Sequence, residues 1–225
     1  MERRNNENHP FRDGFHYTWL MGYLIVIITA YILGCSNMAF YLSKIKKVDL
    51  RSAGSGNLGA SNAMILMGWP AGIAVGLHDV GKATLAVLLA RSIFADLPYI
   101  GAVAGVACVM GHMFPFFLGF KGGKGFASYI GMVLGLNWKF ALVVMVLVVL
   151  VTLITDYIVV GTVTTTVLTP IYMGITQQSM MAAGILLIAT AVILYKHREN
   201  FVRLANGTEI GLRKGGSGKH RVKKD

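Results

Sequence analysis

Long apolar runs alternate with short polar stretches along the chain. A helix that crosses the roughly 30 Å hydrocarbon layer of a membrane needs about 20 mostly apolar residues. Seven runs reach or approach that length, at residues 17–41, 68–90, 98–117, 126–136, 140–154, 157–176 and 180–195. The fourth run is short, and we interpret it as a short, buried span. The pattern therefore predicts an all-α integral membrane protein with seven transmembrane helices.

Composition supports this prediction and excludes other classes of protein. Only 14% of the 225 residues are charged, 55% are hydrophobic and the mean hydropathy is +0.60. A soluble domain carries about 25% charged residues, so a soluble enzyme is excluded, as are a disordered chain and a disulfide-rich secreted domain. The two cysteines, Cys35 and Cys108, lie in apolar runs and are interpreted as small buried hydrophobes. We expect no metal site and no nucleic-acid partner, despite a net charge of +11.

The basic residues indicate how the chain is oriented. Loops on the cytoplasmic side of membrane proteins are enriched in Lys and Arg. Fifteen of the 21 basic residues follow the first, third and seventh runs. We therefore expect the N-terminus outside, the C-terminus in the cytoplasm and a polar site on the cytoplasmic face. The expected organisation is a polar extracellular head (residues 1–16), a seven-span domain (17–209) and a basic, disordered tail (210–225).

The first unusual polar segment, the serine loop (residues 51–62), has a composition that suits an anion. Gly54 and Gly56 allow turns that point backbone N–H groups into a concavity. Further donors are the side chains of Ser55, Asn57, Ser61 and Asn62. The alternative is a flexible loop without a ligand.

The second segment, the lysine loop (residues 111–125), places two cations among glycines. Lys121 and Lys124 surround Gly122 and Gly123, so that a ligand can approach both backbone and ammonium groups. This pattern favours a phosphate, and the alternative is that the lysines only determine topology. His112, near the end of the third run, is interpreted as a supporting residue.

The third segment, the C-terminal segment (residues 196–209), begins with His197, Arg198, Glu199 and Asn200 where the last run ends. It is interpreted as part of a site for an anion with hydroxyl groups, or as a solvated cluster at the membrane surface. Inside the second run, two charged residues stand three apart and can pair. We interpret Asp79 and Lys82 as a structural ion pair that lines the polar end of the site.

The three segments resemble a known family. The sequences GSGNLGASN, GHMFPFFLGFKGGKG and HRENFVRLANGTE are similar to three motifs of the bacterial acyl-phosphate:glycerol-3-phosphate acyltransferases, the PlsY family. The likeness covers roughly residues 17–209. It implies a seven-span cell-membrane protein that transfers an acyl group from acyl phosphate to the sn-1 hydroxyl of glycerol 3-phosphate, giving lysophosphatidic acid. It implies no cofactor, no metal and no acyl-CoA, and it suggests coupling to an enzyme that forms acyl phosphate.

The resemblance also implies residue roles. Ser55 and the amides of residues 54–57 would hold phosphate, and Lys124 would bind substrate oxygens with Lys121 nearby. His197 and Asn200 would bind glycerol 3-phosphate, and Glu199 would brace the site.

Two positions depart from the family pattern. Ala83 stands where the second-span pattern Asp-x-x-Lys-Gly has its glycine. Ile65 stands where the first motif usually has an arginine, and losing a charged hydrogen bond costs about 1.5–3 kcal/mol. Arg51 or Arg198 is a candidate substitute for that charge. The absence of the arginine leaves a weakly active or inactive paralogue as one alternative to an active acyltransferase. A transporter of organic phosphates is the other alternative.

Overall fold

The computed structural model of the chain describes residues 10–176, 179–211 and 213, and within them it contains helices and no strands. The helices are α1 (Pro10–Cys35), α2 (Met38–Lys46), α3 (Ala60–Met67), α4 (Trp69–Ile93), α5 (Ile100–Met113), the 3-10 helix η1 (Phe116–Leu118), α6 (Phe126–Leu136), α7 (Trp138–Thr155), α8 (Ile158–Thr176), α9 (Met180–Lys196) and α10 (Arg198–Ala205). The prediction of an all-helical protein is confirmed.

By length and composition, the described residues contain five or six candidate membrane spans. Five described segments are long and apolar enough to cross a membrane, and α9 with α10, bent by 50°, adds a sixth. The apolar helix α6 has only 11 residues, or about 16 Å at 1.5 Å per residue, which is too short to cross alone. The predicted count of seven, which includes α6, stays a prediction.

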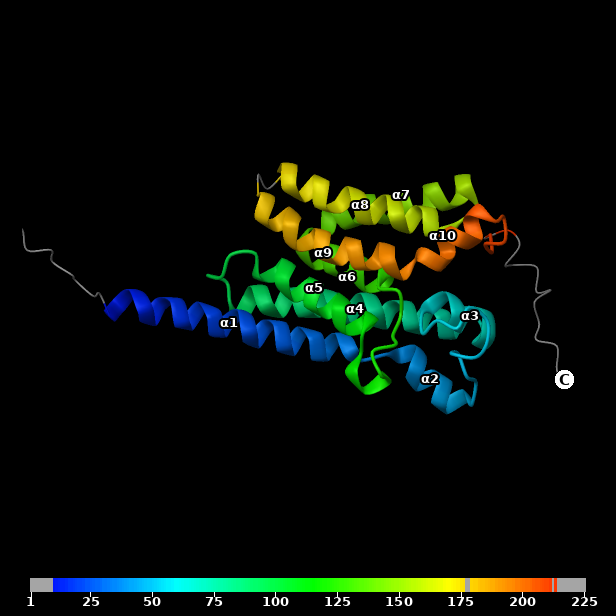
Figure 1. Cartoon of the computed structure of the whole chain (residues 1–225), viewed down its shortest axis with the longest axis horizontal. Helices are drawn as coiled ribbons and strands as arrows, with labels where there is room; N and C mark the ends of the chain where they lie inside the picture. The colour runs from blue at the N-terminus through cyan, green and yellow to red at the C-terminus, as the bar shows by residue number, and fades with distance from the viewer. Residues whose placement is uncertain (1–9, 177–178, 212, 214–225) are drawn as a thin grey trace, which may run out of the picture.

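The polar segments gather at one end of the helical bundle. The long helices run side by side, and α2, α3 and α10 lie together at one end (Figure 1). The opposite end is marked by Arg91, in the last turn of α4, which donates to the carbonyls of Gly135 and Leu136 at the end of α6. The chain therefore runs from the polar end to the opposite end through α6.

The first predicted run, residues 17–41, is broken in the structure. Helix α1 ends at Cys35 and α2 begins at Met38, because Asn37 caps α2 by accepting a hydrogen bond from the Phe40 N–H at 2.9 Å. The carbonyl of Ser36, freed by the break, accepts a hydrogen bond from the Lys82 ammonium at 2.6 Å. An asparagine in an apolar run was the sequence signal for this helix start.

Glycines let the central helices approach closely. A Cβ at Gly131 of α6 would overlap the Val80 carbonyl of α4, and one at Gly34 of α1 would overlap the Cys108 carbonyl of α5. Small residues at such crossings are typical of helix packing in membranes. They bring α6 against α4 and α1 against α5.

Helix α8 contains a proline whose missing N–H is compensated by neighbouring helices. Pro170 cannot donate to the carbonyl of Thr166, four residues earlier. That carbonyl instead accepts from Thr190 of α9 at 2.8 Å and from Tyr129 of α6 at 3.1 Å. Thr166, Thr190 and Tyr129 are all buried, so these hydrogen bonds join α6, α8 and α9 at one point.

The predicted ends of the chain are largely untested. Residues 1–9 of the predicted head, and residues 212 and 214–225 of the predicted tail, lie outside the described residues. Helix α1 begins at Pro10, inside the predicted head. In the tail, the backbone N–H of Arg213 donates to Asp156 at 2.9 Å.

Candidate active site

Hydrogen bonds join the serine loop to the lysine loop. The Nη2 atom of Arg51 donates to the carbonyls of Leu118, at 3.1 Å, and Lys121, at 3.3 Å. An ideal Cβ on Gly123 would lie 3.1 Å from the Leu58 carbonyl. The two segments that the sequence predicts to bind phosphate are therefore in contact.

The conformation of the serine loop is held by Asn62, whose side chain is only 1% exposed. Its Oδ1 accepts from the Ser55 N–H at 2.9 Å. Its Nδ2 donates to the carbonyls of Leu50 at 2.9 Å, Asn57 at 3.1 Å and Ala53 at 3.2 Å. Asn62 was predicted to contact substrate, whereas the structure shows its side chain bonded to the loop backbone.

The backbone of this loop uses positive φ angles at Gly54 (62°) and Gly56 (68°), which favour glycine. Two of the amides expected to hold phosphate are occupied within the loop, because Ser55 N–H bonds Asn62 and Gly56 N–H bonds the Ala53 carbonyl at 3.1 Å. Ser55 and Ser61 are exposed and Asn57 is partly buried. The loop therefore presents hydroxyls more readily than those two amides.

The lysine loop lies against the end of α5. Gly122 N–H donates to the Met113 carbonyl at 3.1 Å, and Gly123 N–H donates to the His112 carbonyl at 3.2 Å. Lys121 is exposed and Lys124 is partly buried. Burial, together with the nearby positive charge of Arg203, lowers the pKa of the Lys124 ammonium below its usual value.

Lys124 joins the lysine loop to the C-terminal segment. Its ammonium donates a hydrogen bond to Oδ1 of Asn200. The Nδ2 of Asn200 donates to Glu209 at 2.6 Å, and the second oxygen of Glu209 accepts from Nε of Arg203 at 2.7 Å. Arg203 and Glu209 were not among the predicted site residues, although both lie in the third matched motif, which was the available signal.

His197 occupies the bend between α9 and α10 and is buried. Its Nδ1 lies 2.8 Å from the Ile193 carbonyl, and because a carbonyl only accepts, Nδ1 carries a proton. In the neutral ring Nε2 is then an acceptor, which suits a substrate hydroxyl. Arg198 and Glu199 are exposed, and the contacts that the structure gives them are to each other at 3.9 Å and, for Arg198, to Tyr195.

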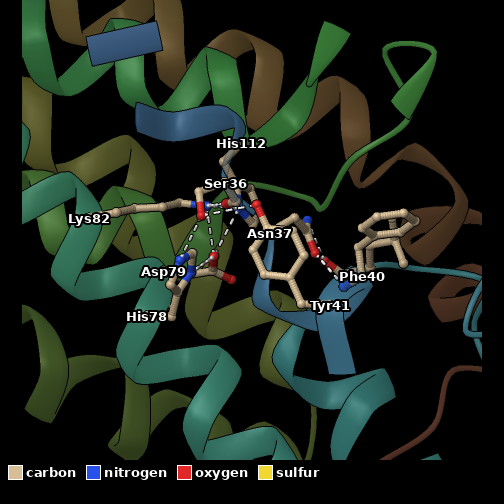
Figure 2. A network of polar contacts seen from close by, with 9 residues as sticks. Ser36, Asn37, Phe40, Tyr41, His78, Asp79, Lys82 and His112 are labelled. Atoms are coloured by element: carbon tan, nitrogen blue, oxygen red, sulfur yellow. Dashed lines mark hydrogen bonds and ion pairs between the residues drawn. The ribbon is translucent and has the colours of Figure 1, made fainter. Parts of the chain in front are cut away.

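The predicted ion pair is present below the loops. The Nζ atom of Lys82 lies 2.8 Å from Oδ1 of Asp79. Figure 2 shows both side chains beside His112 and Ser36. The Nδ1 atom of His112 lies 3.2 Å from the same Asp79 oxygen and 3.0 Å from Lys82 Nζ.

Ile65, which stands where the family has an arginine, is 51% exposed on α3. Of the two candidate substitutes for the arginine, Arg51 bridges the serine and lysine loops, whereas Arg198 donates to the Tyr195 carbonyl at the end of α9. Arg51 is therefore the cation better placed to serve the serine loop.

The fold and the site together define a class of protein. Apolar helices long enough to cross a membrane carry a polar cluster at one end of the bundle. The cluster contains the hydroxyls of the serine loop, the lysines of the lysine loop, the His197 imidazole and the Asn200 amide. Phosphate is bound by charge-assisted hydrogen bonds of this kind. The site is that of a membrane enzyme or binding protein for phosphate-bearing substrates.

Comparison with known proteins identifies the family. A sequence model described as glycerol-3-phosphate acyltransferase matches residues 24–207. The glycerol-3-phosphate acyltransferase of Geobacter sulfurreducens is 37% identical over 84% of this chain and 97% of its own, and that of Coxiella burnetii is 39% identical over the same shares. The chain belongs to the glycerol-3-phosphate acyltransferase family.

A solved structure agrees in fold. The crystal structure of PlsY (YgiH), an integral membrane glycerol 3-phosphate acyltransferase in its glycerol 3-phosphate form, superposes with a TM-score of 0.80. It is 33% identical and covers 84% of this chain and 95% of its own. The resemblance to the PlsY family is thereby confirmed, as is a multi-pass membrane protein of the acyltransferase class, and the comparisons favour this class over a transporter.

Proposed function

We propose that the protein transfers an acyl group from acyl phosphate to the sn-1 hydroxyl of glycerol 3-phosphate, giving lysophosphatidic acid. The observation that carries this proposal is the continuous contact between the three segments, through Arg51 on one side and the Lys124–Asn200 hydrogen bond on the other. These segments supply cations and hydroxyls for two phosphate-bearing substrates. The bundle beside them supplies an apolar surface for the acyl chain.

The chemistry needs positioning and charge stabilisation more than a protein nucleophile. The substrate hydroxyl oxygen attacks the acyl carbon, the bond from that carbon to the phosphate oxygen breaks, and the hydroxyl proton passes to the released phosphate. In this proposal the Ser55 hydroxyl and the Lys124 ammonium bind phosphate oxygens. His197 and Asn200 orient the glycerol hydroxyls.

We extend the proposal to the topology of the chain in the membrane. The site lies at the cytoplasmic face of a cell-membrane protein with seven crossings, an external N-terminus and a cytoplasmic C-terminus. The passage of α6 between the two ends of the bundle supports the seventh crossing. The domain limits are those expected, a head at 1–16, an acyltransferase domain at 17–209 and a tail at 210–225.

Acyl phosphate is a reactive mixed anhydride, so the donor must be made close to where it is used. We therefore include functional coupling to an enzyme that forms acyl phosphate. The transferase itself needs no cofactor in this scheme.

The test is transfer from palmitoyl phosphate to radiolabelled glycerol 3-phosphate by purified protein in detergent, with palmitoyl-CoA as a parallel donor. We expect lysophosphatidic acid from the phosphate donor, none from the CoA donor, and a large loss in the Ser55→Ala variant. Product no greater than in that variant would refute the proposal.

The exposed Ile65 supports a second possibility, a transferase with weak affinity for phosphate. The Ile65→Arg variant separates the two in the same assay. A fall in KM of about tenfold, as expected for one regained charged hydrogen bond, favours the weak enzyme. An unchanged KM indicates that Arg51 already replaces the missing charge.

A further inference from the structure

Three charged or ionisable side chains form a buried cluster below the site. Asp79 is 1% exposed, Lys82 5% and His112 3%. One oxygen of Asp79, Oδ1, lies 2.8 Å from Lys82 and 3.2 Å from His112, and a fourth group, His78, lies 3.5 Å away. Charged groups in the interior of a membrane protein are costly and usually have a specific use.

The cluster fixes the orientation of the His112 ring. Its Nδ1 is engaged by both Asp79 and Lys82, beside which Figure 2 shows the ring, so Nε2, across the ring, points away from the charged pair. On that side lies Gly123, where an added Cβ would overlap Nε2. The imidazole is therefore a contact surface between the charged pair and the lysine loop.

The backbone of residues 122–124 follows the end of α5 at this point. Gly123 N–H bonds the His112 carbonyl and Gly122 N–H bonds the Met113 carbonyl. A Cβ at Gly122 would overlap the same His112 carbonyl. Lys124 comes next in the chain, and its ammonium donates to Asn200.

The cluster reaches the serine loop by a second route. Lys82 donates to the Ser36 carbonyl at 2.6 Å. The neighbouring Asn37 caps α2 and donates to the Leu58 carbonyl at 3.5 Å. That carbonyl lies beside Gly123, so both loops are supported from the same charged pair.

We propose that Asp79, Lys82 and His112 form a positioning unit, which sets residues 122–124 through the His112 ring and thereby places Lys124 in the phosphate site. The proposal rests on the proposed function. It assigns these residues no contact with substrate, and it predicts that their loss affects binding of glycerol 3-phosphate more than turnover.

A double-mutant cycle tests the contact between ring and loop. The variants are Gly123→Ala, His112→Ala and the double variant, with Gly81→Ala as the matched control. Gly81 stands on α4 beside Lys82, and a Cβ there meets nothing within 4 Å. KM and kcat are measured with palmitoyl phosphate, and binding of glycerol 3-phosphate is measured by calorimetry.

Each single variant is expected to raise KM for glycerol 3-phosphate about tenfold or more, with kcat changed less than threefold. Because the alanine at 123 overlaps the ring, removing the ring relieves the overlap, and the double variant should be no worse than His112→Ala alone. Gly81→Ala should behave as wild type. Multiplicative effects of the two single variants on KM would overturn the proposal.

A second variant decides the matter if His112→Ala does not fold. Asp79→Asn combined with Lys82→Met removes both buried charges together, which a folded core tolerates better than removing one. We expect monodisperse protein with raised KM and weaker calorimetric binding. A wild-type KM in this variant would overturn the proposal, whereas an inactive wild-type enzyme would instead refute the proposed function.

Discussion

Asn62 determines the shape of the serine loop, and its replacement by alanine provides a quantitative test of the site. The variant removes four hydrogen bonds, one accepted from the Ser55 amide and three donated to the carbonyls of Leu50, Ala53 and Asn57. Because the side chain is 1% exposed, water does not replace all of these bonds. The loop then loses the support that orients Ser55.

The magnitude follows from the hydrogen bonds. Each neutral bond contributes about 0.5–1.5 kcal/mol net. The Asn62 amide has two N–H groups for its three carbonyl acceptors, so the side chain counts as about three full bonds, or about 1.5–4.5 kcal/mol. Partial replacement by water puts the expected loss at about 1.5–3 kcal/mol. A loop that opens by this amount lowers the apparent affinity for phosphate by roughly 10- to 150-fold.

The assay is initial-rate kinetics of acyl transfer, combined with thermal unfolding of the purified protein in detergent. The matched control is Asn137→Ala. Asn137 also accepts a backbone N–H, that of Phe140 at 3.1 Å, but it follows α6 at the opposite end of the bundle. The control should lose about 1 kcal/mol of stability and keep its KM.

The asymmetry between these variants is the decisive result. Asn62→Ala should raise KM by at least tenfold while the control does not. Equal KM values in Asn62→Ala and wild type would show that the loop does not depend on this side chain, and the reasoning would be wrong.

Three further predictions concern the lysine loop and the packing beneath it. The lowered pKa of Lys124 means that its charge is lost at lower pH than that of an ordinary lysine. KM for glycerol 3-phosphate should therefore begin to rise at a lower pH than the loss of charge from an ordinary lysine would cause, and Lys124→Arg, which stays charged, should abolish that rise. Identical pH profiles of the two proteins would contradict this. Arg51→Met removes both hydrogen bonds between the serine loop and the lysine loop and should raise KM about 3- to 30-fold. Arg51→Lys should restore little, because lysine lacks the forked guanidinium that reaches two carbonyls at once. Full rescue by lysine would show that only the charge matters. Gly131→Ala places a methyl group against the Val80 carbonyl and should lower the free energy of unfolding by about 1–3 kcal/mol. The measurement is the unfolding temperature, which should fall. An unchanged unfolding temperature would argue against the close crossing of α4 and α6.

Much of the fold could be predicted because membrane helices are long and uniformly apolar. The predicted 126–136 matches α6, and the predicted 157–176 differs from α8 by one residue. The break after Cys35 was missed, because it depends on a side-chain cap by Asn37 and a distant lysine rather than on hydropathy. Helix α3 was missed for a similar reason, since it lies within a glycine-rich stretch whose conformation is set by tertiary contacts.

The candidate site was predicted in composition but not in detail. Motifs identified which segments belong together, and the structure brings them into contact. The sequence did not separate side chains that face a ligand from those that hold a loop, and Asn62 illustrates this because its partners are backbone atoms 5 to 12 residues away. Asn200, the partner of Lys124, and Glu209, which accepts from Asn200, likewise depend on the bend between α9 and α10, which the sequence does not show.

The carbonyl that Pro170 leaves free in α8 has a consequence for assembly. Apolar side chains in lipid give little preference for one axial alignment of neighbouring helices over another. A hydrogen bond does give such a preference, because its partners meet at only one position along each helix. By accepting from Tyr129 and Thr190 at once, the Thr166 carbonyl fixes how far α6 and α9 extend along α8, and it thereby sets Lys124, which precedes α6, level with Asn200, which follows α9.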